Sequence, residues 1–402
     1  MIRELYQQTL REISLNVTSG EIDSLRKKNI TKSGCRVYDS GYLGIAGILG
    51  QPDEKTWAQA KANLTRKIPC PWGAETGKQR KVSYGGQMEP EAFLAEVEKL
   101  LAALRQAYPQ FIFSNKLNWV AEETSLRNDM GLDYFCQNSY AEVGILVRAQ
   151  ESANIFDTVI GGTYQNFVAE NVLKEASEIL EAHLHPISLP EGEKAAVIAG
   201  IDLFDRAWSE GLHTQKLARN ASPFSGKLGK QLFSQDFTLQ VNRSNTSDYK
   251  FPFFDAEGTT LEGDAISLIE NGVLLRGYSD KKSAEEHGVA LTASAAGNYD
   301  DVPSLSAAAL DIKPTGKTID EILNGRPALY IMPSGGDVTP DGNFATPVQI
   351  AYLYQNGHFL GRLPEFSLRG NLYELFGKDY LGCAQFVPGV GSRCVLEMTI
   401  VR

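Results

Sequence analysis

The sequence has few of the residues that build metal sites. It contains five histidines in 402 residues: His183, His185, His213, His287 and His358. Only His183 and His185 lie close together, and side chains two positions apart diverge on a helix. No Gly-x-Ser-x-Gly elbow is present to support a Ser/His/Asp hydrolase. We therefore expect neither a paired-histidine metal site nor a recognisable serine nucleophile.

Long apolar runs and paired cysteines are also missing. No stretch approaches the length that crosses a bilayer, and the first eight residues contain no apolar signal core. The five cysteines are odd in number and scattered, without a Cys-x-x-Cys pair, which is typical of reduced thiols in a cytosolic protein. We expect a cytoplasmic protein that does not bind a membrane.

Positive charge is in short supply. The chain has 39 Lys and Arg against 49 Asp and Glu, a formal net charge of -10. An acidic surface of this kind repels a phosphate backbone, and the densest basic cluster, Lys78–Lys81, is too short to offset that repulsion. We expect no nucleic-acid partner. A hydrophobic content of 43% over this length predicts a globular protein of two domains.

The first half is predicted to be an antiparallel meander with three helices. Period-two alternation and turn residues predict strands at 13–17, 21–32, 35–39, 42–49, 111–114, 117–124, 132–138 and 141–150. Apolar stripes predict helices at Glu54–Arg66, with Asp53 as its cap, at Glu91–Tyr108 and at about Gln165–Leu184. Residues 67–88 are rich in proline and glycine and are predicted to form a loop.

The second half is predicted to be richer in strands. After a linker at Leu189–Gly192 we expect a strand at Lys194–Ala199 and a helix at Asp202–Leu217. Asn-Gly pairs predict type I′ hairpins within 269–274 and 354–359. The remaining predictions are helices at 281–287 and 318–324 and strands at 328–332 and 393–401. The fold class is therefore α+β, in two domains (1–188 and 189–402) of mostly antiparallel sheets with flanking helices.

An ordered set of segments resembles the TldD/PmbA family, first described as modulators of DNA gyrase and later as peptidases. The set spans nearly the whole chain. It consists of Gly20–Asp23, Gly34–Gly44, Leu126–Leu132, Ser222–Gln231, Phe254–Thr260, Leu268–Leu274, Ser283–Gly288 and Gly335–Thr339.

The resemblance implies a zinc helix soon after the domain junction. In the family's active members this helix bears His-Glu-x-x-x-His, and a cysteine nearer the C-terminus completes the site. Here the helix predicted at Asp202–Leu217 offers carboxylates and one histidine, His213, and no second imidazole. Cys383 lies roughly where the family's ligand cysteine would fall. His213 and Cys383 are weak metal candidates only, so we expect no catalytic residue and no bound metal.

The missing histidine pair indicates the PmbA (TldE)-like branch. The leading hypothesis is a non-catalytic subunit, forming a homodimer or a heterodimer with a TldD-like subunit around a cleft for an unfolded, extended peptide. Arg206, His213 and Arg219 are the candidates for contact with that peptide. One alternative is an active metal-dependent peptidase with atypical ligands, for instance zinc held by His213, Cys383 and a carboxylate. A second alternative is a protein-binding modulator of DNA gyrase.

Overall fold

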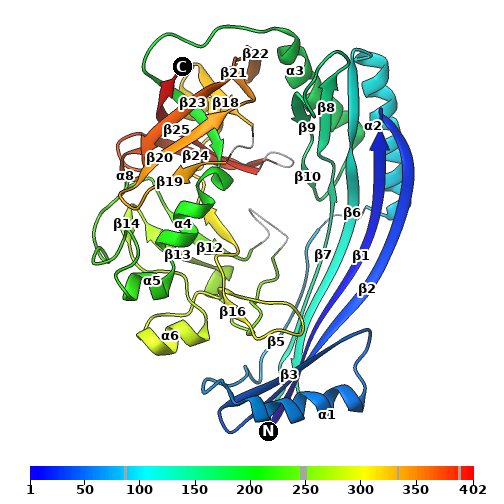
Figure 1. The fold of residues 1–402 in the computed structure, drawn as a ribbon, viewed down its shortest axis with the longest axis vertical. Helices are drawn as coiled ribbons and strands as arrows, with labels where there is room; N and C mark the ends of the chain where they lie inside the picture. The colour runs from blue at the N-terminus through cyan, green and yellow to red at the C-terminus, as the bar shows by residue number, and fades with distance from the viewer. Residues whose placement is uncertain (86–87, 245–250, 333–334, 388–390) are drawn as a thin grey trace.

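The computed structural model describes residues 1–85, 88–244, 251–332, 335–387 and 391–402. Figure 1 shows a tall curved sheet formed by the first half of the chain, beside a more compact body formed by the second half. The sheets are mostly antiparallel and are flanked by helices, so the predicted α+β class is confirmed. No helix among the described residues is long and apolar enough to cross a membrane.

Long antiparallel strands dominate the first sheet. In spatial order they are β10 (Thr163–Tyr164), β7 (Asp133–Glu142), β6 (Phe111–Asn128), β1 (Ile2–Thr18), β2 (Glu21–Asp39), β3 (Tyr42–Leu49) and β4 (Ile68–Pro69). Beside this path, β5 (Gln79–Ser83) pairs in parallel with β7, β8 (Ile145–Ala149) pairs with β6, and β9 (Thr158–Ile160) pairs with β8.

Three α-helices accompany this sheet. They are α1 (Glu54–Ala62), followed by a 3-10 turn at Asn63–Arg66, α2 (Pro90–Ala107) and α3 (Ala169–Leu184). The apolar stripe predicted for α2 is buried against the sheet and α3, with Phe93, Val97 and Leu104 fully buried. The Asp53 carboxylate accepts the Thr56 amide hydrogen at 2.8 Å, so the predicted cap of α1 is confirmed.

The second half builds a larger and two smaller sheets. The larger sheet runs β19 (Asp337–Val338), β20 (Asn343–Val348), β23 (Phe366–Asn371), β25 (Gly391–Val401), β11 (Lys194–Gly200), β18 (Ala328–Ile331), β21 (Ala351–Gln355) and β22 (His358–Arg362), with β24 (Tyr380–Val387) also on β25. The smaller sheets are β14 (Val273–Leu274), β13 (Ala265–Glu270), β12 (Leu239–Asn242) and β17 (Leu310–Ile312), and β15 (Ala295–Ala296) with β16 (Ser304–Leu305).

Short helices cover these sheets. They are α4 (Asp205–Gly211), α5 (Thr214–Ala218), α6 (Lys281–His287), α7 (Ile319–Leu323) and α8 (Leu372–Leu375), with 3-10 turns at Ile201–Phe204 and Glu262–Asp264. The main apolar core packs α4 and α8 against the strands and contains the fully buried Trp208 of α4. A smaller apolar cluster packs α7. The domain boundary expected at residues 188 and 189 falls between α3 and β11, where the chain passes from the first sheet to the larger second sheet.

Both predicted Asn-Gly hairpins are confirmed. Asn271 and Gly272 have φ of 47° and 78° between β13 and β14, and Asn356 and Gly357 have φ of 50° and 84° between β21 and β22. These positive values are what a type I′ turn requires.

Other strand predictions are wrong. The strands predicted at 21–32 and 35–39 are one strand, β2, because Gly34 continues the pairing instead of ending it. The two strands predicted between residues 111 and 124 are likewise one strand, β6. The predicted loop at 67–88 contains β4 and β5. β5 is mostly exposed and polar, so its sequence lacks the apolar alternation that predicts a strand. It is a strand because it pairs with β7.

The two halves meet at a tight interface on β2 and β6. A Cβ atom at Gly34 would lie 1.8 Å from the carbonyl oxygen of Tyr299, so this position of β2 has room only for glycine. Phe253 and Phe254 pack on Tyr134 of β7, with ring centroids 5.2 and 5.3 Å apart. The segment around Phe254 therefore joins the second half to the first sheet, and this junction positions the site described next.

Candidate functional site

The helix predicted at Asp202–Leu217 is not continuous. The chain forms a 3-10 turn, then α4, and leaves the helix at Leu212 before α5 begins after His213, whose backbone is extended (φ −67°, ψ 113°). The Leu212 carbonyl accepts the Tyr278 amide hydrogen at 2.9 Å, and Thr214 Oγ1 donates to the Tyr278 carbonyl at 2.6 Å. This pairing with a neighbouring segment replaces the helical hydrogen bonds, which the local sequence did not reveal.

The α4 helix, where the resemblance puts the zinc motif, carries carboxylates. Burial and the nearby Asp202 raise the pKa of Asp205, and Glu210 forms an ion pair with Lys216. Within the described ranges, no group of three or more His, Cys, Asp and Glu side chains is arranged to hold a metal ion.

The structure separates the residues that the sequence singled out. Cys383 is fully buried in the core on β24, and its thiol lies 3.7 Å from the Ile312 carbonyl oxygen. Arg206 of α4 is exposed and donates to Asp337 at 2.5 Å. Arg219 is exposed at the end of α5. Of these residues and His213, only His213 lines a cavity described below, and the peptide-contact role of all three groove candidates stays a prediction.

A cavity of about 670 Å³ lies between the two halves; we call it the inter-domain cavity. From the first half it is lined by residues 68–73 together with Tyr38 and Leu43. From the second half it is lined by His213, Gln215, Glu257, Asp280, Lys281, Lys282, Glu285, Glu286 and residues 302–305.

A buried carboxyl, Glu257, belongs to the polar wall of this cavity. Its side chain is 8% exposed, and Oε2 accepts the Lys281 amide hydrogen at 2.8 Å. Burial, and next the neighbouring Asp255 carboxylate, raise the pKa of Glu257 to about 8. Asp255 itself accepts the amide hydrogens of Glu257 and Thr259 at 2.9 Å and of Ala295 at 3.0 Å. Glu257 therefore holds a proton near neutral pH unless a cation joins it.

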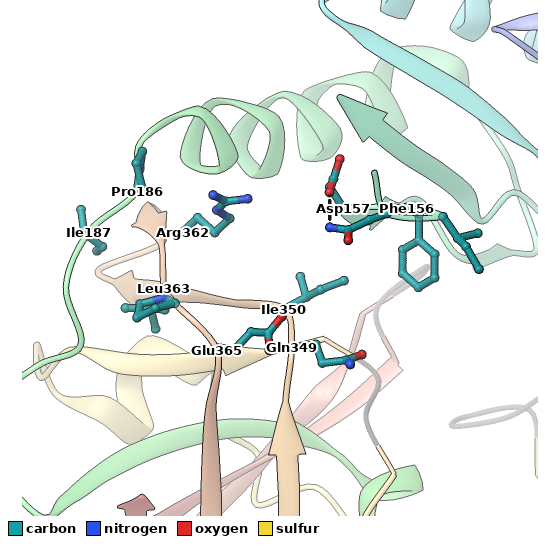
Figure 2. A pocket seen from close by; sticks show the side chains of 12 residues that line it. Phe156, Asp157, Pro186, Ile187, Gln349, Ile350, Arg362, Leu363 and Glu365 are labelled. Atoms are coloured by element: carbon teal, nitrogen blue, oxygen red, sulfur yellow. Dashed lines mark hydrogen bonds between the residues drawn. The ribbon is translucent and has the colours of Figure 1, made fainter. Parts of the chain in front are cut away.

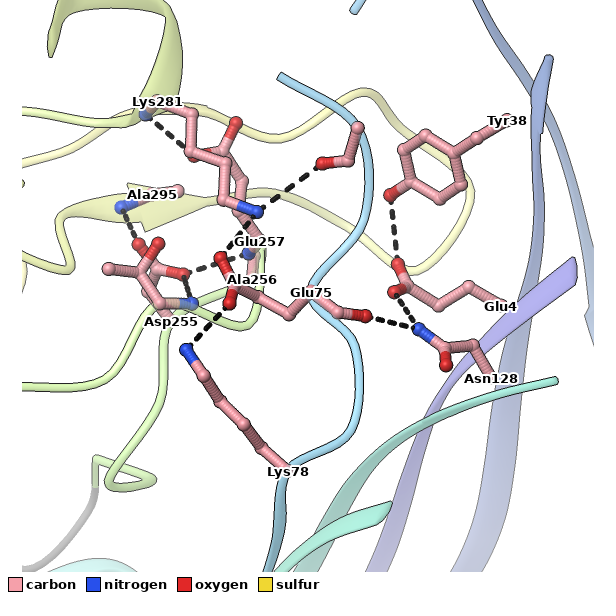
Figure 3. A network of polar contacts seen from close by, with 12 residues as sticks. Glu4, Tyr38, Glu75, Lys78, Asn128, Asp255, Ala256, Glu257, Lys281 and Ala295 are labelled. Atoms are coloured by element: carbon pink, nitrogen blue, oxygen red, sulfur yellow. Dashed lines mark hydrogen bonds and ion pairs between the residues drawn. The ribbon is translucent and has the colours of Figure 1, made fainter. Parts of the chain in front are cut away.

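The Lys281 side chain connects this wall to the first half (Figure 3). Its ammonium lies 3.0 Å from Glu75 Oε1, and the Glu75 carbonyl accepts from Asn128 Nδ2 at 2.7 Å. Although burial acts to raise it, the pKa of Glu75 is lowered by the ammonium groups of Lys78 and Lys281. The network thus bridges β6, the loop before β5 and the start of α6.

Beneath this network lies a fully buried ion pair, Glu4 and Arg36. Arg36 Nη1 is 3.5 Å from Glu4 Oε1 and also donates to the Ala256 carbonyl at 2.6 Å, across the domain interface. Glu4 further accepts from the Tyr38 hydroxyl at 2.8 Å and from Asn128 Nδ2 at 3.3 Å. Both charged side chains have no exposed surface, and the hydrogen bond from Arg36 to Ala256 links this buried pair of the first half to the second half.

His213, which the sequence singled out as a metal and peptide-contact candidate, lines this cavity. Its ring packs edge-on against Tyr278, with centroids 5.5 Å apart. Burial lowers the pKa of His213, and Asp280 acts in the opposite direction. The imidazole is therefore neutral at neutral pH, and its Nδ1 is buried without a hydrogen-bond partner among the residues described.

A second cavity, of about 530 Å³, lies between the loop before β9 and the strands of the larger second sheet (Figure 2). Its lining includes Phe156, Asp157, Ile350 and Arg362, and the neighbouring Ile155 is 88% exposed. Arg362 Nη1 lies 3.4 Å from Nε2 of His183, whose pKa is lowered to about 4, chiefly by burial. This cavity combines apolar side chains with a guanidinium at the end of edge strand β22.

Sequence reasoning missed most of the inter-domain cavity. Glu257 has no motif of its own, but it lies in Phe254–Thr260, and Lys281 lies two residues before Ser283–Gly288. Both are segments that carry the family resemblance. Their convergence on one cavity could have been used to pick out these residues, whereas residues 68–73 offered only a proline-rich loop.

Comparison with known proteins agrees with the resemblance. Residues 197–385 match the PmbA/TldA metallopeptidase C-terminal domain. An uncharacterized protein of Methanocaldococcus jannaschii is 24% identical over 91% of this chain and 87% of its own length. A metalloprotease of Archaeoglobus fulgidus is 24% identical over 94% of this chain and 91% of its own length.

Two solved structures have the same fold over the whole chain. TldE from Thermococcus kodakarensis matches with a TM-score of 0.79 and 18% identity, covering 100% of this chain and 97% of that one. A Thermotoga maritima protein whose name associates it with modulation of a DNA gyrase matches with a TM-score of 0.75 and 18% identity, covering 100% and 96%. These findings lead to one conclusion: residues 197–385 belong to the PmbA/TldA metallopeptidase C-terminal domain family, and the whole chain has the fold of these two structures.

Proposed function

We propose that the chain is a non-catalytic subunit of a TldD/PmbA-type metallopeptidase complex. The observation that carries this proposal is the composition of α4, which lies where the resemblance puts the zinc helix yet presents Asp205 and Glu210 and no histidine. Zinc peptidases hold the metal with imidazoles and use it to generate hydroxide from bound water near neutral pH. A subunit without those ligands would leave the hydrolysis to a metal-bearing partner.

The second part of the proposal is a role in holding unfolded peptide. Extended peptides bind to exposed strand edges through main-chain hydrogen bonds, with little regard to sequence. The larger second sheet has two edge strands, β22 and β19. The backbone of Arg362 at the end of β22 is already hydrogen-bonded to His185 and Ile187. In the part of the chain that the structure describes, no second strand pairs with β19, and we propose β19 as the edge for the peptide. The name TldE of one structural neighbour, and the name metalloprotease of one relative, are consistent with a peptidase assembly.

Metal analysis and a cleavage assay test the proposal. The isolated chain should contain less than about one tenth of an equivalent of zinc after purification in zinc-supplemented buffer, and it should not cleave an unfolded peptide. Mixing it with a TldD-like subunit that carries His-Glu-x-x-x-His should give a complex on size exclusion and chelator-sensitive cleavage. Stoichiometric zinc with cleavage by the chain alone would refute the proposal.

The alternative of an active peptidase with atypical ligands predicts a different result for His213→Ala. That enzyme would lose its activity, whereas in a non-catalytic subunit the substitution would remove at most a peptide contact, so the mixed complex would keep most of its cleavage rate. The positions of the two candidates favour the non-catalytic role, since the Cys383 thiol is in the core and His213 lines the inter-domain cavity. A gyrase-modulator role predicts that DNA gyrase, and not a TldD-like subunit, is the dominant protein co-purified from native lysate.

A further inference from the structure

Carboxylates outnumber cations in the lining of the inter-domain cavity. The charged lining residues are Glu257, Asp280, Glu285, Glu286, Lys281 and Lys282. Both lysines already have acidic partners: Lys281 Nζ lies 3.0 Å from Glu75 Oε1, and Lys282 Nζ lies 3.9 Å from Glu286 Oε1. Even while Glu257 holds a proton, the cavity therefore has an excess of negative charge, from Asp280, Glu285 and Glu286, that its own cations do not balance.

Glu257 is the carboxyl in this lining that most lacks a counter-charge. Asp280 is held by the Ser283 amide and hydroxyl at 2.8 and 2.6 Å, as the cap of α6. Glu257 accepts one backbone hydrogen bond and, within the described part of the chain, forms no ion pair. An ionised carboxylate buried in this way is costly until a cation reaches it. The site is thus built to gain from an incoming positive group.

The lining of the cavity also has an apolar part. It includes Trp72 with Pro71 on the first half and Val302 with Leu305 on the second half. A half-buried indole can stack on a guanidinium or an ammonium group. The aliphatic stems of arginine and lysine suit an apolar wall while their charged ends reach a carboxylate. The volume of about 670 Å³ is sufficient for one such side chain.

We propose that the inter-domain cavity binds a guanidinium or ammonium group, with Glu257 as its counter-charge and Trp72 as its apolar wall. The basic side chain of an extended peptide is the expected source of the cation, and in that respect the inference rests on the proposed function. The chain would then select unfolded peptides that carry Arg or Lys, while main-chain contacts elsewhere remain indifferent to sequence.

A pair of matched peptides tests this selection on the full chain. The first is a fluorescein-labelled, unstructured Gly/Ser/Ala peptide with one central arginine, and the second replaces that arginine by citrulline, which has nearly the same shape and no charge. Fluorescence anisotropy should show the arginine peptide binding at least about tenfold more tightly, because a charge-assisted hydrogen bond is lost in the second peptide. In Glu257→Gln the ratio should fall to about one to two.

Glu257→Gln is a conservative change, since the amide oxygen still accepts the Lys281 amide hydrogen. The matched control is Glu98→Gln, at an exposed position of α2 outside the cavity, which should keep the tenfold ratio. Should Glu257→Gln lose its folded circular dichroism spectrum, Glu285→Gln on the exposed face of α6 replaces it, and its ratio should fall at least about twofold. Equal binding of the two peptides to the unaltered chain, or a full ratio in the folded cavity variant that is measured, overturns the proposal.

Two further measurements assign the source and separate this inference from the proposed function. Competition of free arginine amide with the labelled peptide identifies the natural source of the cation. Weak competition assigns the cation to a peptide side chain, and strong competition assigns it to a free amine. Both results support the cavity as the cation site. The binding assay needs neither zinc nor a partner subunit. Zinc-dependent cleavage by the isolated chain would therefore refute the non-catalytic role alone, whereas loss of the arginine preference in an inert chain would refute the cation site alone.

Discussion

Replacement of Arg36 by methionine should destabilise the protein far more than a surface substitution does. Methionine keeps much of the aliphatic volume but leaves the fully buried Glu4 without its cation and the Ala256 carbonyl without its donor. Removing one partner of a buried ion pair costs about 3–5 kcal/mol. The Tyr38 and Asn128 hydrogen bonds to Glu4 remain, so we expect a loss in the free energy of unfolding near the lower end of that range.

A double-mutant cycle with Glu4→Gln measures the coupling free energy between the two buried charges. Glu4→Gln alone strands the buried guanidinium, whose Nε and Nη2 already lack partners among the described residues, and should cost a similar amount. The double variant contains no uncompensated charge, so its cost should fall to about 1–3 kcal/mol, from the carbonyl of Ala256 that loses its donor. The coupling between the two sites should therefore be at least about 2 kcal/mol.

Urea unfolding followed by tryptophan fluorescence gives these free energies. The matched control is the exposed cross-strand pair Arg11 and Glu123, 3.5 Å apart, for which Arg11→Met should cost less than about 1 kcal/mol. Costs that simply add in the double variant, or an Arg36→Met variant as stable as the Arg11→Met control, would show that the buried charges do not depend on one another.

Three further predictions concern the domain interface and its titrating groups. Gly34→Ala should lower the free energy of unfolding in urea by roughly 1–3 kcal/mol, because the new Cβ collides with Tyr299, and it should expose the interface to limited proteolysis. The control Gly144→Ala has open space around the new Cβ and should leave the stability nearly unchanged. The free energy of unfolding should fall as the pH drops from about 6.5 toward 4, by up to about 1.4 kcal/mol per pH unit, because His183 binds a proton in the unfolded chain and stays neutral in the folded one. A His183→Asn variant that keeps this slope would contradict the assignment to His183. The pKa of Glu257 is raised to about 8, so folded Glu257 keeps a proton that the unfolded chain releases above about pH 4.5, and the free energy of unfolding falls as the pH rises to 8. Between pH 5 and pH 8 the free energy of unfolding of Glu257→Gln should rise by roughly 2–4 kcal/mol relative to that of the unaltered chain. Parallel pH profiles of the two proteins would contradict this prediction.

The sequence predicts the local structure well where the chemistry is local. The Asp53 cap, the apolar stripe of α2 and the two Asn-Gly turns depend on residues a few positions apart, and all are confirmed. The break at Leu212 and His213 could not be predicted in the same way, because it depends on backbone hydrogen bonds to the segment at Tyr278.

The candidate site was predictable only in part for the same reason. The absence of a second histidine beside His213 is visible in the sequence, and it leads directly to the proposed role. The inter-domain cavity assembles Trp72, Glu257 and Lys281 from positions that are far apart in the chain. Their meeting depends on how the Phe254–Thr260 segment docks on β6 and β7, for which no periodicity or spacing gives a signal.

The burial of every thiol has a practical consequence for experiments on this protein. All five cysteines are free and buried, and burial raises the pKa of Cys35, Cys70 and Cys136 to about 11. Thiolate is the form that attacks maleimides, so the unaltered folded chain should resist labelling at neutral pH. Cysteines introduced at one exposed position of each half, such as Glu98 and Glu285, would accept dyes or spin labels without removal of the native cysteines, so distances between the two halves become measurable.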